Sequence, residues 1–329
     1  MLIHCIRYWR GESIPRCLTL FVGGNHEAPG HLREMYFGGY ASKDIFYLGH
    51  SGVFKVGGMR VVGVSGIYKS QDFEKPIFEA PPYSEQTKRS AYHVRKYEIE
   101  KLMLIREPVD IVVSHDWPSG ITSYGDTESL LRMKDRTGQL RQEIQTNTLG
   151  NPHTMRLLKK LKPRYWFAGH MHAKYAALYQ HEDGSVTRFL ALDKCVPRRS
   201  FLQLIRDLET KDSHQGVFLD LEWLAILKVN NGLLPVQGPC PTLRSPTNAD
   251  LEHVRTLLQN SKAEQPEPGR FLFPYFGQTS PGNNQYRQWM CELLEMSDRM
   301  AQPGEASAVP PPAVPDTVVS PDALFYIDY

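Results

Sequence analysis

Three short apolar runs, each followed at once by a histidine-bearing cluster, are the feature that most restricts the fold of this chain. They span residues 17–22, 109–113 and 165–168. Short runs of this kind, closed by glycine or polar residues, predict strands buried on both faces of an α/β sheet. Ligands of open α/β sheets bind beyond the carboxyl ends of the strands, where all three clusters lie. The pattern therefore predicts a functional site at these strand ends.

The composition is that of a globular protein with nearly balanced charge. Of the 329 residues, 41% are hydrophobic and 22% are charged, which allows one large domain or two ordinary ones. A net charge of +2 is too small to indicate nucleic-acid binding, so any basic surface must be local. Because no apolar run reaches the roughly 18 residues of a membrane span and no leader pattern is visible, we expect a soluble intracellular protein without membrane contact. Five scattered cysteines predict reduced thiols in the core.

Glycines and capping residues predict further elements around the three strands. Residues 54–64 are expected to form a hairpin that turns at Gly57 and Gly58. Three other stretches show apolar residues at helical spacing, and their N-caps are predicted at Thr127, Asn151 and Asn248.

The chain divides into three expected parts. Residues 1–197 carry the histidine clusters and an insert over residues 66–98, whereas residues 198–300 lack such clusters and predict a smaller accessory domain. Residues 301–329 contain six prolines and four acids, and neither lysine nor arginine, which predicts a disordered acidic tail.

The clusters contain the residue types that bind hard and borderline metal ions. Asn25, His115, His170 and His172 are candidate ligands, because imidazole suits zinc, iron and manganese and a neutral amide oxygen can complete the shell. In an extended segment, residues two apart point the same way, so His170 and His172 are expected to face one site. His26 is a candidate general acid for a leaving oxygen. Two metals about 3.5 to 4 Å apart can stabilise the attacking and leaving oxygens of an in-line displacement.

Each cluster alone also has an ordinary structural interpretation. A lone His-x-His is usually incidental, an Asn-His-Glu segment can cap a helix, and a single histidine is usually a buried core residue. The occurrence of all three at strand ends, in this order, favours the metal site.

The order Gly-Asn-His-Glu, lone His and Gly-His-x-His resembles the latter half of the calcineurin-like metallophosphoesterase pattern. The resemblance implies a fold in the α/β class, a sandwich of two mixed sheets flanked by helices. It implies that Asn25, His115 and His170 hold one metal and that His172 contributes to its neighbour. It also implies that His26 is the acid and contacts the scissile phosphate.

The sequence around these clusters resembles the lariat debranching enzymes in particular. The similarity runs from about residue 17 to residue 227, and a weaker similarity covers residues 290–294. Its most specific segments are residues 20–27, 64–70, 81–83, 92–95, 114–118, 189–195 and 222–226. The resemblance implies hydrolysis of the 2′–5′ phosphodiester at the branch point of intron lariat RNA, a step of mRNA processing. It also implies a nuclear location and two divalent ions, which can be manganese, iron or zinc.

The insert over residues 66–98 interleaves aromatic and basic side chains, a composition suited to single-stranded RNA. In the debranching enzymes this stretch corresponds to a lariat-recognition loop. The predicted substrate-binding residues are Tyr68, Lys69, Tyr83, Tyr92 and Arg95. The alternative is an ordinary surface excursion, since four acids dilute its positive charge, namely Asp72, Glu74, Glu79 and Glu85.

The sequence departs from the family pattern at its start. Members begin with an Asp-x-His or Cys-x-His block and a Gly-Asp block, and neither occurs here, so one metal keeps three expected ligands while the other keeps only His172. An incomplete gene model or an alternative start is the expected cause. Two other functions stay open. One is a catalytically impaired truncated isoform that binds lariat RNA or a protein partner without hydrolysis; the other is a metallophosphoesterase acting on phosphoproteins or linear nucleic acid.

Overall fold

A computed structural model describes residues 7–301 of the chain, apart from residues 9, 207, 209–215 and 278–283. The predicted acidic tail therefore lies almost entirely outside the described residues. No helix within the described ranges is long and apolar enough to cross a bilayer.

Two mixed sheets form the centre of the molecule, as the expected α/β sandwich requires. The smaller sheet has the order β1-β3-β2, with β1 (Thr19–Phe21) parallel to β3 (Ile45–Tyr47) and β2 (Gly39–Ser42) antiparallel to it. The larger sheet has the order β10-β4-β5-β6-β7-β9-β8, and β5, β6, β7 and β9 run parallel. Its strands are β4 (Ser51–Val56), β5 (Met59–Val64), β6 (Ile111–Ser114), β7 (Tyr165–Ala168), β8 (Tyr175–Gln180), β9 (Val186–Ala191) and β10 (Phe218–Leu219).

The predicted hairpin and the three predicted strands are confirmed, but burial on both faces holds only for β6 and β7, because Thr19 and Phe21 of β1 are only half-buried. β4 and β5 pair antiparallel across the Gly57-Gly58 turn, where both glycines have positive φ angles of 56° and 75°. Every residue of β6 and β7 is buried, which explains their continuous apolar runs.

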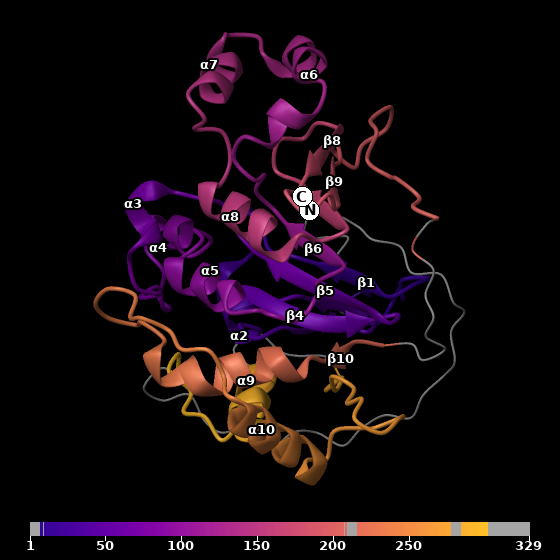
Figure 1. Ribbon diagram of the computed structural model, residues 1–329. Coiled ribbons are helices and arrows are strands. Elements are labelled where there is room, and N and C mark those ends of the chain that lie inside the picture. The colour runs from indigo at the N-terminus through magenta and orange to yellow at the C-terminus, as the bar shows by residue number, and fades with distance from the viewer. Residues whose placement is uncertain (1–6, 9, 207, 209–215, 278–283, 302–329) are drawn as a thin grey trace.

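Helices cover the sheets on both sides, and one pair stands apart from them (Figure 1). Helices α5 and α8 pack against each other over the larger sheet, α9 and α10 lie along its β10 end, and α6 and α7 project beyond the strands as an arm. The helices are α2 (Pro29–Glu34), α3 (Ser70–Phe73), α4 (Glu85–Ser90), α5 (Lys96–Met103), α6 (Thr127–Lys134), α7 (Gln139–Gln145), α8 (Pro152–Leu161), α9 (Leu221–Asn230), α10 (Asn248–Asn260) and α11 (Gln285–Leu293), with 3-10 turns η1 (Ile121–Tyr124) and η2 (Asn231–Leu233).

Helix caps differ from prediction at two of three positions. Asn151 caps α8 as expected. The caps of α6 and α10 are Asp126 and Thr247, one residue before the predicted Thr127 and Asn248. In each case the cap side chain accepts the backbone N–H of the third helical residue, which only the residue just outside the first turn can reach.

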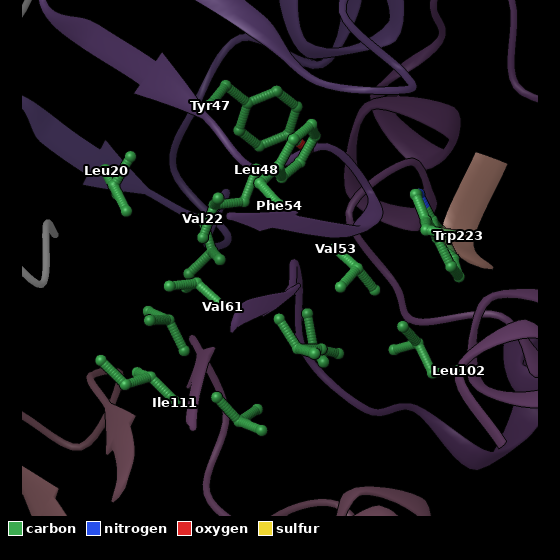
Figure 2. Close-up of a cluster of buried hydrophobic side chains, with 14 of the residues drawn as sticks. Leu20, Val22, Tyr47, Leu48, Val53, Phe54, Val61, Leu102, Ile111 and Trp223 are labelled. Atoms are coloured by element: carbon green, nitrogen blue, oxygen red, sulfur yellow. The ribbon is translucent and has the colours of Figure 1, made fainter. Parts of the chain in front are cut away.

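A single hydrophobic core runs from the sheets into the carboxyl-terminal region (Figure 2). Val53 and Val61 of the β4–β5 hairpin lie in it with Ile111 of β6, and Trp223 of α9 packs at its far side. β10 extends the larger sheet by pairing with β4, so residues beyond 198 complete the architecture that residues 1–197 begin. The division between residues 197 and 198 stays a prediction.

The thiols that the structure describes are free, as expected. Cys17 and Cys291 are buried in the core. Cys240 is half-buried and Cys195 is exposed, so the expectation of core positions holds for only two of these four residues.

Candidate metal centre

The first cluster lies on a loop that follows β1 and is tied to the larger sheet. The backbone N–H of Gly23 donates to Ser65 Oγ at 3.0 Å, and its carbonyl accepts the N–H of Gly66 at 2.7 Å. Glu27 folds the loop over itself, because its Oε2 accepts the N–H of Gly24 at 2.7 Å. The site therefore forms where the two sheets meet, and the loop carrying Asn25 is held from both sides.

His115 follows β6 and lies at the centre of the candidate site. It is 2% exposed, and its Nε2 lies 3.0 Å from Asn25 Oδ1. Its carbonyl accepts the N–H of Gly169 at 3.1 Å, which joins the second cluster to the third. The rings of His115 and His170 are 5.0 Å apart between centroids, so the three strand ends bring Asn25, His115 and His170 together.

The third cluster adopts a different backbone from the one expected. His170 and His172 have φ angles of 59° and 49°, so both are left-handed and the segment is not extended. His170 and His172 therefore do not face one site as alternate residues of an extended segment, and this expectation is wrong. Non-glycine residues held in this region are strained and occur preferentially at functional sites. Trp117 stabilises the turn, because its indole N–H donates to the Gly169 carbonyl at 2.7 Å.

Burial favours the neutral form of the three histidines proposed as metal ligands. Burial, followed by the neighbouring charges of His170, His172 and His26, lowers the pKa of His115 to about 3. Burial also lowers the pKa of His170, with Lys69 as the next cause, and the pKa of His172, with Lys194 and Lys134 as the next causes. A neutral imidazole presents the lone pair that a metal ion requires.

Three of the predicted ligands fit a divalent metal ion. Two neutral imidazoles and an amide oxygen form a donor set that manganese, iron or zinc accepts. Gly24 leaves room for this arrangement, because a Cβ at that position would lie 2.5 Å from Cε1 of His115. Within the part of the chain that the structure describes, no three His, Cys, Asp or Glu side chains cluster as metal ligands, so the set depends on Asn25.

His26 and Lys69 border this group of ligands. His26 is exposed on the loop after Asn25, and its charge contributes to the lowered pKa of both His115 and His170. Lys69 is exposed at the start of the insert, and its charge acts on His170.

The three tyrosines predicted to bind substrate, Tyr68, Tyr83 and Tyr92, are half-buried. Tyr68 contacts Phe73 and His153, with ring centroids 5.7 Å and 5.4 Å away. Tyr92 lines a cavity behind the Gly23-Gly24 turn. Tyr83 lies over α2, where burial raises its pKa.

Arg95 is placed differently from the other predicted substrate-binding residues. It is 3% exposed, its guanidinium pairs with the buried Glu79, and it donates to the Ser90 carbonyl at 3.1 Å. Asp72 is likewise used internally, in a 2.6 Å contact with His93. Glu79 and Asp72, two of the acids expected to dilute the positive charge of the insert, thus stabilise its fold. Arg95 is used in the same way and does not face a ligand.

Four residues that support the site were not predicted from the sequence. Asp116 is buried and accepts the N–H of Tyr68 at 3.0 Å, which fixes the insert beside His115. Burial raises its pKa to about 6. The others are Glu27, Ser65 and Lys134. Glu27 and Asp116 belong to the motifs already noted, whereas nothing in the local sequence marks Ser65 or Lys134.

Comparison with known proteins gives consistent matches. The family profile described as "Lariat debranching enzyme, C-terminal domain" matches residues 184–299. A protein named lariat debranching enzyme from Arabidopsis thaliana is 50% identical over 231 residues, which cover 70% of this chain and 54% of the relative. The Homo sapiens protein of that name is 47% identical over 238 residues, 70% of this chain and 43% of the relative. That of Drosophila pseudoobscura pseudoobscura is 34% identical over 372 residues, 94% of this chain and 68% of the relative. The chain spans about half the length of the plant and human relatives.

Proposed function

Because this chain belongs to the lariat debranching enzyme family, we propose that it hydrolyses the 2′–5′ phosphodiester at the branch point of intron lariat RNA. The observation that supports this function best is the convergence of Asn25, His115 and His170 from three strand ends. An RNA-processing role on intron products would place the protein in the nucleus.

The proposed cofactor is a divalent metal ion held by Asn25, His115 and His170, with His172 contributing to a second ion. When bound, such an ion polarises the phosphoryl oxygens and stabilises the charge that develops on them. The chain's own contribution is to present neutral ligands: the buried His115 stays unprotonated far below neutral pH. The carbonyl-to-amide contact between His115 and Gly169 fixes the spacing of the two histidine loops.

Proton transfer and substrate orientation fall to residues at the border of the site. Water adds to phosphorus and releases one proton to solvent as the bond to the leaving oxygen breaks. The leaving oxygen takes up a proton, for which the exposed His26 is the proposed donor. Lys69 neutralises phosphate charge beside His170, and Tyr68 and Tyr92 offer ring faces to the bases flanking the branch.

A second candidate is binding of lariat RNA, or of a protein partner, without hydrolysis. The observation that favours it is the donor count: the described residues bring three proposed ligands to one ion, and only His172 is proposed for the other. This protein would still hold branched RNA through the insert. A phosphoesterase for phosphoproteins or linear nucleic acid is the less favoured alternative.

The test is a cleavage assay with the purified chain and a synthetic RNA that contains one 2′–5′ branch. With Mn²⁺ we expect cleavage at the branch, inhibition by a chelator, and no cleavage of the 3′–5′ linkages. His26→Ala should retain metal and RNA binding but lose at least about 100-fold in rate, the usual contribution of a general acid.

Tight binding without cleavage by the wild-type chain would establish the binding-only alternative. Equal rates on 2′–5′ and 3′–5′ linkages would instead indicate a general nuclease. His253→Ala provides the matched control, because this histidine is exposed on α10, in the carboxyl-terminal region.

A further inference from the structure

A group of cations gathers on the side of the site that His172 occupies. The first is Lys134, the last residue of α6, whose Nζ donates to the carbonyl oxygen of His172 at 3.0 Å. The arm formed by α6 and α7 projects beyond the sheet (Figure 1). It therefore meets the site through a cation that touches the loop carrying a proposed ligand.

The loop after β9 brings two more cations to the same place. Asp193 is buried and organises this loop: one carboxylate oxygen accepts the backbone N–H of Lys194 at 2.7 Å, and the other pairs with Arg199 Nε at 2.8 Å. The N–H of Asp193 also donates to the Ser200 carbonyl at 3.1 Å. These contacts hold Lys194 and Arg199 on the outside of a fixed turn, and the Arg199 side chain is 40% exposed.

The two segments lie side by side, because Ala168 and Ala191, the last residues of β7 and β9, are paired in the larger sheet. The loop after β9 therefore starts next to the loop of His172 that Lys134 contacts. Arg136 is exposed and follows Lys134 by two residues. We call Lys134, Arg136, Lys194 and Arg199 the basic rim.

Two carboxylates of the described residues lie near the basic rim and offset only part of its charge. Asp193 pairs with Arg199. Asp135 is turned towards the start of α7, where its oxygens accept the N–H groups of Leu140 and Arg141 at 3.2 Å and 3.3 Å. The rim therefore keeps an excess of positive charge, held on two separately folded segments next to one end of the proposed catalytic site.

We propose that the basic rim binds the phosphates of the RNA strand that leaves the branch point on the His172 side. The proposal rests on the proposed function, since a branch phosphate bound at Asn25, His115 and His170 must continue into flanking nucleotides. Cations neutralise backbone phosphates independently of base sequence. The rim thus supplies affinity and strand direction, while the insert on the Lys69 side faces the other part of the substrate.

The test is fluorescence anisotropy with a branched RNA whose 2′–5′ bridging oxygen is replaced by methylene, so that it cannot be cleaved. The variant is Arg136→Ala with Lys194→Ala, because Lys134 and Arg199 hold internal contacts that a truncation would break. We expect Kd to rise about tenfold, and the slope of log K against log salt to fall by about 1.4 for two lost phosphate contacts on a single strand. The pair Arg136→Lys and Lys194→Arg should restore both values.

Two controls make the result specific. Lys159→Ala with Lys160→Ala removes the same charge from the last turn of α8, which leads into the opposite end of β7 from His170. This control should bind like the wild type. A branched trinucleotide lacks flanking phosphates, so the rim variant and the wild type should bind it equally.

The outcomes separate the rim from the proposed function. If the wild type prefers branched over linear RNA but the rim variant keeps its affinity and salt slope, the rim proposal is overturned and the function stands. The rim proposal is also overturned if the variant loses as much affinity for the trinucleotide as for the longer RNA. It is overturned as well if an acidic peptide displaces the labelled RNA as effectively as unlabelled RNA does. If the wild type does not prefer branched RNA, the proposed function itself fails.

Discussion

Substituting Gly24 by alanine should disturb the candidate metal centre by steric contact alone. Gly24 lies outside the left-handed region, so alanine suits its backbone, but the new Cβ would lie 2.5 Å from Cε1, 2.7 Å from Nδ1 and 2.9 Å from Nε2 of His115. Ordinary contact begins at 3.4 Å, so the ring must retreat by about 0.9 Å. Functional sites tolerate displacements of about 0.5 Å. We expect metal affinity to fall about 10- to 100-fold, as when a supporting contact of a metal site is lost, and stability to fall by about 1 to 3 kcal/mol.

Isothermal titration with Mn²⁺ or Zn²⁺ measures the affinity, and urea unfolding without metal measures the stability. Gly232→Ala is the matched control, because no atom lies within 4 Å of a Cβ built there. Metal binding by Gly24→Ala as tight as that of the wild type, or an equal loss of affinity in both glycine variants, would contradict the steric role of Gly24.

Two further predictions concern the scaffold that supports the site. Arg60→Met leaves the carboxylates of Asp220 and Glu222 without their buried partner and should destabilise the chain by about 3 to 5 kcal/mol in urea unfolding. The control Arg141→Met breaks an exposed ion pair and should leave the unfolding midpoint unchanged. An equal loss of stability in both variants would contradict the role given to burial. Burial lowers the pKa of His50 to about 4. Between pH 6.5 and 4 the unfolded chain therefore binds a proton at this residue that the folded chain does not. The free energy of unfolding should fall by about 2 kcal/mol from pH 7 to pH 5. His50→Gln should reduce this pH dependence, and an unchanged dependence would exclude His50 as its source.

Much of the architecture could be predicted because it depends on local patterns. The buried strands β6 and β7 and the β4–β5 hairpin follow from apolar runs and paired glycines. The distribution of strands between two sheets could not be read from these runs, because β1 has the same pattern as β6 and β7 but pairs with β3.

The candidate site could likewise be predicted only where it depends on local sequence patterns. The side chains of Asn25, His115 and His170 meet as expected, although the left-handed backbone of His170 had no signal in the sequence. Arg95 looked like a substrate-binding cation because its partner, Glu79, is 16 residues away and burial cannot be judged from composition. Lys134 is 38 residues from His172, so their contact exists only once the arm has folded.

Titration of the purified chain with Co²⁺, followed by its visible absorption, tests whether Asn25, His115 and His170 hold a metal ion together. We predict a saturable band from nitrogen and oxygen ligands that is lost in His115→Ala, strongly weakened in Asn25→Ala, and unchanged in His181→Ala, whose imidazole contacts Thr187 at 2.8 Å at the distant end of β8 and β9. A band of the same intensity and affinity in His115→Ala would contradict the proposed metal centre.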